Sequence, residues 1–165
     1  MRNLQAMRQE DIQLKEERDM LYAAYGSNLN KYQMLWRCPG ASKAGTAVIK
    51  GYRLMFKGSR SGAYLTIEKA KGCEVPVGLW NVTESDIKNL DRYEGYPNFY
   101  YKKTFVAECS DGKRHRIFAY IMHEERPLGI PSQYYVDVCT EGYGDFGFDL
   151  DVLKDAIEYT ARGVA

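Results

Sequence analysis

The sequence LYAAYGSNLN, residues 21–30, begins as an apolar run typical of a strand and stops abruptly at a Gly-Ser-Asn turn. A strand that ends in such a turn points several backbone N–H groups in one direction, which builds a small cradle for an anion or an oxyanion. The alternative is an ordinary strand-to-helix turn, in which Ser27 or Asn28 caps the segment 29–37. Local spacing favours this plainer alternative, so a functional interpretation needs support from elsewhere in the chain.

Two further segments supply that support. Residues 90–100 read LDRYEGYPNFY, and residues 131–135 read PSQYY, followed by Gly142 and Gly147. In this order, and together with YGSNL at 25–29, the motifs resemble the γ-glutamylcyclotransferase-like family, including its AIG2-like branch. The resemblance spans residues 20–149. The aromatic residues in GYGDFGFD, residues 142–149, depart from many relatives, so no substrate preference is carried over.

The resemblance implies an α+β fold, a small, mostly antiparallel, mixed β-barrel with flanking helices. The pattern of elements along the chain agrees, because runs of strands have helices grouped between and after them. An Asp-Gly pair at the tip of residues 110–113 predicts a hairpin between the last two strands. The expected strands are 20–25, 42–57, 63–67, 75–81, 100–109 and 114–122, and the expected helices begin near residues 30, 84, 133 and 150.

The length of 165 residues and a hydrophobic content of 45% predict one domain with a single core. We expect this domain to occupy residues 20–165. Residues 1–19 are charged and helix-prone but have no sustained apolar stripe, which predicts a helical or mobile extension. An alternative is that this extension covers the interface between the two subunits of a homodimer.

Charge and hydropathy exclude several classes of partner. Lys and Arg total 23 against 22 Asp and Glu, so the net charge of +1 provides neither a basic surface for nucleic acid nor a polybasic membrane signal. No apolar run approaches the roughly 18 residues of a membrane helix, and no signal-peptide core follows the N-terminus. We therefore expect a cytoplasmic protein that binds neither nucleic acid nor membrane.

The sequence also argues against a metal or a cofactor. The four cysteines at 38, 73, 109 and 139 are far apart and lack zinc-ligand spacing, so we expect reduced thiols. Phosphate-binding glycine motifs and a nucleophile elbow are absent from the sequence. A single carboxylate among aromatic residues is a poor site for a hard or borderline cation.

Glu94 is the acidic residue that we expect to carry out chemistry. The signature TESD at residues 83–86 predicts the start of a helix, and Gly95 predicts its end. Glu94 therefore lies where exposed helix carbonyls disfavour a carboxylate, and aromatic neighbours surround it. Both effects raise its pKa toward the range of a general acid–base group. The alternative is a solvated surface glutamate beside a helix-ending glycine.

The resembled family converts a γ-glutamyl amine or peptide into 5-oxoproline and a free amine. Because the substrate's own α-amine attacks its γ-carbonyl, no catalytic serine or cysteine is needed. The resemblance implies that Glu94 is the general acid and base. The implied substrate-binding residues are Tyr22, Tyr25, Gly26, Ser27, Asn28, Leu29, Tyr100 and Tyr135, with Tyr134 as a rival to Tyr135 and Tyr120 as a further candidate.

Two other functions remain open from the sequence. The fold could serve as a module that binds a small acidic metabolite without turnover. It could also remove a γ-glutamyl protecting group from an intermediate of one particular pathway. The retention of Glu94 favours an enzyme.

Overall fold

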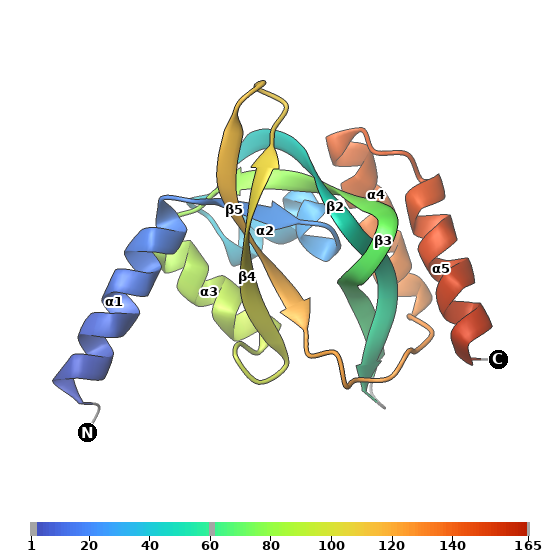
Figure 1. Cartoon of the computed structure of the whole chain (residues 1–165), viewed down its shortest axis with the longest axis horizontal. Coiled ribbons are helices and arrows are strands. Elements are labelled where there is room, and N and C mark those ends of the chain that lie inside the picture. The colour runs from blue at the N-terminus through green and yellow to red at the C-terminus, as the bar shows by residue number, and fades with distance from the viewer. Residues whose placement is uncertain (1–2, 60–61, 165) are drawn as a thin grey trace.

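The computed structural model describes residues 3–59 and 62–164 (Figure 1). Helices and strands alternate irregularly along the chain. Their order is α1 (Leu4–Arg18), β1 (Leu21–Ala24), the 3-10 turn η1 (Ser27–Leu29), α2 (Lys31–Arg37), β2 (Ser42–Ser59), β3 (Gly62–Asn81), α3 (Glu84–Glu94), β4 (Tyr100–Glu108), β5 (Arg114–Met122), α4 (Gln133–Phe146) and α5 (Asp151–Val164).

The described strands form one mixed sheet with the order β2-β3-β1-β5-β4. Strands β1 and β5 pair in parallel, and the other neighbours pair antiparallel. In Figure 1, α1 and α3 lie at one side of the sheet and α4 and α5 at the other. This arrangement confirms the predicted α+β class. It also places the short strand β1, which leads into the Gly-Ser-Asn turn, at the centre of the sheet.

The predicted closure of the sheet into a barrel is wrong. Between the edge strands β2 and β4, the described residues form one isolated bridge, which pairs Ala47 with Cys109. Further along the gap the edges meet through side chains instead, because the rings of Tyr52 and Phe105 pack edge to face at 5.3 Å. The two edges are therefore joined by one bridge and by side-chain packing, and not by a continuous ladder.

Strand β3, which forms a hairpin with β2, is longer than the sequence pattern predicts. Residues 63–67 and 75–81 belong to a single strand, β3, which pairs with β2 along almost its full length. The intervening residues 68–74 lack apolar alternation because that part of the hairpin is largely exposed. Gly51, with φ +79°, lies at a register shift of β2 against β3.

The ends of α3 follow the predicted signals. Thr83 accepts a hydrogen bond from the Asp86 N–H at 3.1 Å, and the Asp86 side chain accepts one from the Thr83 N–H at 3.0 Å. This reciprocal pair forms a capping box. At the other end, Gly95 ends the helix with φ +63°, a left-handed conformation that glycine adopts without a steric cost. Glu94 is therefore the last residue of α3.

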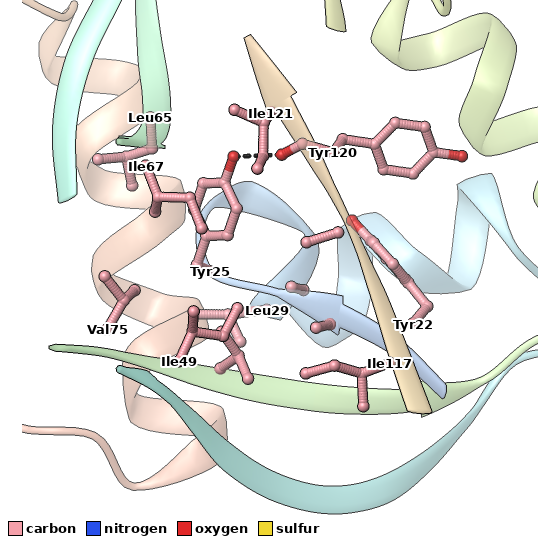
Figure 2. Close-up of a cluster of buried hydrophobic side chains, with 14 of the residues drawn as sticks. Tyr22, Tyr25, Leu29, Ile49, Leu65, Ile67, Val75, Ile117, Tyr120 and Ile121 are labelled. Carbon is pink, nitrogen blue, oxygen red and sulfur yellow. Dashed lines mark hydrogen bonds between the residues drawn. The ribbon is translucent and has the colours of Figure 1, made fainter. Parts of the chain in front are cut away.

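The hydrophobic core lies on the inner face of the curved sheet, as Figure 2 shows. Aliphatic side chains such as Ile49, Val75 and Ile117 are buried there, with 3% exposure or less. Tyr25 lies among aliphatic side chains such as Ile67 and Ile121, whereas Tyr22 packs beside Tyr120. Buried tyrosine hydroxyls need hydrogen-bond partners, so the core is polar at these positions.

Helix α1 covers residues 4–18 of the N-terminal extension and projects from the body of the molecule (Figure 1). Its C-terminal half contacts α3 and β1. The four cysteines are free thiols, and three of them are buried. Among the described residues, no helix has both the length and the apolar character required to cross a bilayer.

Candidate active site

A cavity of about 440 Å³ lies beside the end of β1 and the end of α3. Eight of the nine residues proposed from the sequence lie in its wall, although they are scattered between positions 22 and 135. The structure thus brings the Gly-Ser-Asn loop and Glu94 together. The lining residues are Tyr22, Ala23, Tyr25, Gly26, Ser27, Asn28, Tyr64, Leu65, Arg92, Tyr93, Glu94, Gly95, Phe99, Tyr100, Tyr120 and Tyr135.

The loop after β1 forms a single 3-10 turn that leaves backbone donors at the cavity wall. The Leu29 N–H bonds to the Gly26 carbonyl at 3.0 Å, and the Asn30 N–H bonds to the Ser27 carbonyl at 3.0 Å. Within residues 3–59 and 62–164, the N–H groups of Gly26, Ser27 and Asn28 bond to no protein acceptor. These three groups are available to a ligand.

Leu29 is the exception among the predicted site residues. Its side chain is fully buried in the core (Figure 2), and its N–H is used inside the turn. Leu29, which the resemblance implies as a substrate-binding residue, therefore offers neither its side chain nor its N–H to the cavity. The 3-10 turn is the physical reason, because a turn of this kind consumes the N–H that lies three residues after its first carbonyl.

Two glycines allow the loop to pack tightly against its surroundings. A Cβ atom on Gly26 would lie 3.1 Å from the Tyr135 hydroxyl, so Tyr135 on α4 closely approaches the loop. A Cβ atom on Gly142 would lie 2.6 Å from the backbone nitrogen of Asn30, so α4 rests directly on the loop backbone. Because interiors of this density resist deformation, the packing holds the unpaired N–H groups in place.

The Asn28 side chain connects the loop to Glu94. Its amide nitrogen donates to Glu94 Oε1 at 3.1 Å and to the Tyr22 hydroxyl at 2.9 Å. Its amide oxygen accepts a hydrogen bond from Arg37 at 2.6 Å. Arg37 in turn stacks on the Tyr93 ring, with 3.6 Å from its central carbon to the ring centroid. Arg37 therefore fixes which end of the Asn28 amide faces the carboxylate.

Glu94 lines the cavity and is only partly accessible. Burial raises its pKa from 4.5 to about 7, while the Arg37 charge and the Asn28 hydrogen bond oppose the rise. The predicted direction of the shift is confirmed, and loss of solvent is its largest cause. A carboxyl group with a pKa near neutrality can both accept and return a proton at physiological pH.

The tyrosines of the cavity act as hydrogen-bonding groups. Tyr25 donates to the Tyr120 carbonyl (Figure 2), and Tyr100 donates to the Leu65 carbonyl at 3.0 Å. Tyr135 accepts from the Leu65 N–H at 3.1 Å. Burial raises the pKa of Tyr25, Tyr100 and Tyr135 above the ordinary tyrosine value, so their hydroxyls stay protonated at neutral pH.

Of the two tyrosines that were candidates for the cavity wall, one lines it, and the structure adds a residue that sequence reasoning missed. Tyr134 is 74% exposed, whereas Tyr135 lines the cavity, and Tyr120 lines it too. Arg37 was not predicted. The only sequence signal for it is its place on the short helix that follows the loop. Across the described part of the chain, no three His, Cys, Asp or Glu side chains converge so as to hold a metal ion.

Comparison with known proteins shows the family of the chain. A sequence model of the family described as γ-glutamyl cyclotransferase, AIG2-like, matches residues 22–137. The chain belongs to the AIG2-like γ-glutamyl cyclotransferase family. The motif resemblance noted in the sequence is thus confirmed, and the region matched by the family contains both the cradle loop and Glu94.

Curated relatives and a solved structure of this γ-glutamyl cyclotransferase family extend the likeness over most of the chain. The chain is 30% identical to the γ-glutamylcyclotransferase of Bos taurus over 155 residues, covering 88% of this chain and 81% of the relative. It is 28% identical to that of Homo sapiens over 151 residues, covering 86% and 79%. A solved γ-glutamyl cyclotransferase structure superposes with a TM-score of 0.70 at 27% identity, covering 88% of this chain and 86% of that chain.

Proposed function

We propose that the protein is an enzyme that cyclises a γ-glutamyl amine or peptide to 5-oxoproline and releases the free amine. Membership of the γ-glutamyl cyclotransferase family supports this class of reaction. The observation that carries the proposal is the shared cavity, in which a carboxyl group with a pKa of about 7 and three unpaired backbone N–H groups line the same space.

In the proposed reaction the nucleophile belongs to the substrate. The ionised Glu94 takes a proton from the substrate's α-ammonium group, and the freed amine attacks the γ-carbonyl carbon. A new C–N bond closes the five-membered ring, and the bond to the departing nitrogen breaks. Two protons in total leave the attacking nitrogen and two arrive on the departing one, so Glu94 accepts and returns a proton twice.

The remaining residues hold the substrate in a reactive shape. An intramolecular attack is accelerated chiefly by correct positioning, which a rigid loop and a wall of tyrosines provide. The N–H groups of Gly26, Ser27 and Asn28 would bind either the substrate's carboxylate or the oxyanion that develops during attack. The Asn28 amide would keep Glu94 oriented toward the reacting nitrogen. Each proposed step uses only this chain and its substrate.

The proposal is tested by incubating the full-length protein with γ-glutamyl amino acids, γ-glutamylamines and glutathione, and quantifying 5-oxoproline and the free amine. We expect the two products in equal amounts from at least one class. Because Arg92 adds a cation to the cavity wall, we expect leaving groups that carry a carboxylate to react best. Tight binding without 5-oxoproline from any substrate would instead favour a metabolite-binding module. Activity confined to one γ-glutamylated intermediate would favour a pathway-specific role.

A further inference from the structure

Lys102 on β4 is a buried cation that joins three elements. Its side chain is only 7% exposed, and its Nζ atom lies 2.8 Å from Glu17 on α1 and 2.8 Å from Asp91 on α3. The Glu17 side chain is equally buried, at 7% exposure. Removing an ion from water is costly unless the ion is well paired. Loss of one partner would leave the others with an uncompensated charge, so these contacts depend on one another.

The ion pairs reach the cavity through a tyrosine. The Tyr120 hydroxyl donates to Asp91 Oδ1 at 2.6 Å, and Tyr120 lines the cavity. The Asp91 oxygen that accepts this proton is the same atom that contacts Lys102. A hydroxyl that has given its only proton to a carboxylate can offer just its lone pairs to a ligand. Tyr120 therefore presents a hydrogen-bond acceptor to the cavity.

The neighbouring tyrosine has the opposite polarity. The Tyr22 hydroxyl accepts a hydrogen bond from Asn28 and so keeps its own proton for donation. The rings of Tyr22 and Tyr120 lie 5.8 Å apart in an edge-to-face arrangement. Two neighbouring tyrosines, one with a hydroxyl that donates and one with a hydroxyl that accepts, can distinguish an anionic from a cationic part of a bound molecule.

We propose that Glu17, Lys102 and Asp91 are positioning residues that hold the Tyr120 hydroxyl as an acceptor for the substrate's α-ammonium group. This inference rests on the proposed function, since it takes a γ-glutamyl compound as the ligand. Lys102 holds the Asp91 carboxylate in place by its contact with Oδ1 at 2.8 Å. Without Lys102, that carboxylate is free to turn away from Tyr120. The Tyr120 proton can then point into the cavity, where it repels the ammonium group.

The inference gives α1 a part in the site, although it lies outside the family match at residues 22–137. Glu17 is in the last turn of α1 and does not line the cavity. Its effect on a ligand therefore passes through Lys102, Asp91 and Tyr120 in turn. Another ion pair made by α1, between Arg18 and Glu84 of α3 at 3.5 Å, is solvent-exposed and leads to no cavity residue. This pair provides a matched control.

The test measures binding by calorimetry to the full-length protein carrying Glu94→Gln, so that no turnover interferes. The two ligands are γ-glutamylglycine and glutarylglycine, which differ only in the α-amino group. Lys102→Met and Tyr120→Phe should each weaken γ-glutamylglycine about tenfold, a loss typical of a hydrogen bond to a charged group. Glutarylglycine should change less than about twofold. Arg18→Gln should leave both affinities unchanged.

Equal weakening of both ligands by Lys102→Met would show that the network only shapes the cavity, and would overturn the inference. Unchanged affinity for both ligands in a folded Lys102→Met protein would also overturn it, as would failure of γ-glutamylglycine to bind. If Lys102→Met does not fold, Tyr120→Phe and Glu17→Gln decide the question with the same pair of ligands. Because binding is the readout, this test is independent of turnover. Binding with the expected selectivity in the Glu94→Gln background, together with no release of 5-oxoproline by the parent protein, would contradict the proposed reaction alone.

Discussion

The two carboxylates at the ends of α3 have opposite surroundings. Asp86, in the first turn, is 2% exposed and accepts hydrogen bonds from the Thr83 N–H at 3.0 Å and the Gly40 N–H at 3.2 Å. The partial positive charge at a helix N-terminus stabilises it further. Glu94, the last residue, receives one hydrogen bond, from Asn28, and borders a cavity. On the same helix, Asp86 is therefore hydrogen-bonded and stabilises the fold, whereas Glu94 is able to exchange protons.

The largest expected effect is the loss of turnover in Glu94→Gln. The amide preserves the shape of the side chain but cannot accept and return a proton, so turnover should fall by roughly two to four orders of magnitude. Side-by-side measurement of 5-oxoproline release by the parent and the variant checks this.

Asp86→Asn is the matched control, because it makes the same chemical change at the other end of the helix. A folded Asp86→Asn protein should keep turnover within about threefold of the parent. Asp86 does not line the cavity, so its carboxylate cannot exchange a proton with the substrate. Equal activity of the parent and Glu94→Gln would show that Glu94 is not the proton shuttle.

The next effect comes from the loop that faces Glu94 across the cavity. Gly26→Val places a branched side chain where even a Cβ atom would lie 3.1 Å from the Tyr135 hydroxyl, so either Tyr135 or the loop must move. We expect about a hundredfold loss of kcat/KM, because small misplacements of binding groups are costly in catalysis. Ser27→Ala, which leaves the backbone intact, should lose far less. A folded Gly26→Val protein with parental turnover would reduce the loop to an ordinary turn.

The pKa of Glu94 predicts the pH dependence of the reaction. Glu94 must be ionised to take the first proton, and its pKa is about 7. The value of kcat/KM should therefore fall about tenfold for each pH unit below that point. Asp86→Asn should retain the same inflection. A profile that stays flat down to pH 5 in a protein shown to be folded by circular dichroism would contradict the assignment.

The smallest effect is on thermal stability, where the two acids should differ in sign. The pKa of Glu94 is higher in the folded chain than its ordinary 4.5, so the folded state binds the proton more tightly and loses stability as pH rises from 4.5 through 7. Glu94→Gln should therefore raise Tm at pH 8 and have less effect at pH 5. Asp86→Ala removes a helix cap and should lower Tm by about 2 to 8 °C at both pH values. Calorimetric scans at the two pH values measure both shifts, and a lower Tm for Glu94→Gln at pH 8 would contradict the comparison.

The features that sequence reasoning found are those written in short local patterns. The capping box at Thr83 and the helix-ending Gly95 locate Glu94 at the end of α3 without any tertiary information. The Gly-Ser-Asn turn is equally local. The motif resemblance then supplied what local patterns cannot, namely that these two segments share a site.

The features that it missed depend on contacts between distant residues. Arg37 acts on Asn28 only because α2 folds back beside the loop, and no spacing rule reveals which arginine does so. The sheet stays open between β2 and β4, where the edges meet through one bridge and the packing of Tyr52 on Phe105, a contact invisible in either strand alone. Leu29 was misplaced because a 3-10 turn and a wider anion-binding loop have the same residue preferences.

The packing of α4 on the loop has a consequence for the order in which the chain acquires function during synthesis. Gly142 rests on the backbone of Asn30, and Asn30 donates to the Val138 carbonyl at 3.1 Å. Tyr143 also donates to the Tyr25 carbonyl at 3.2 Å. The loop leaves the ribosome well before α4, the helix that holds it. We expect a nascent chain to present no competent cavity until α4 has emerged and docked, so that a truncated translation product would be inert toward its ligand.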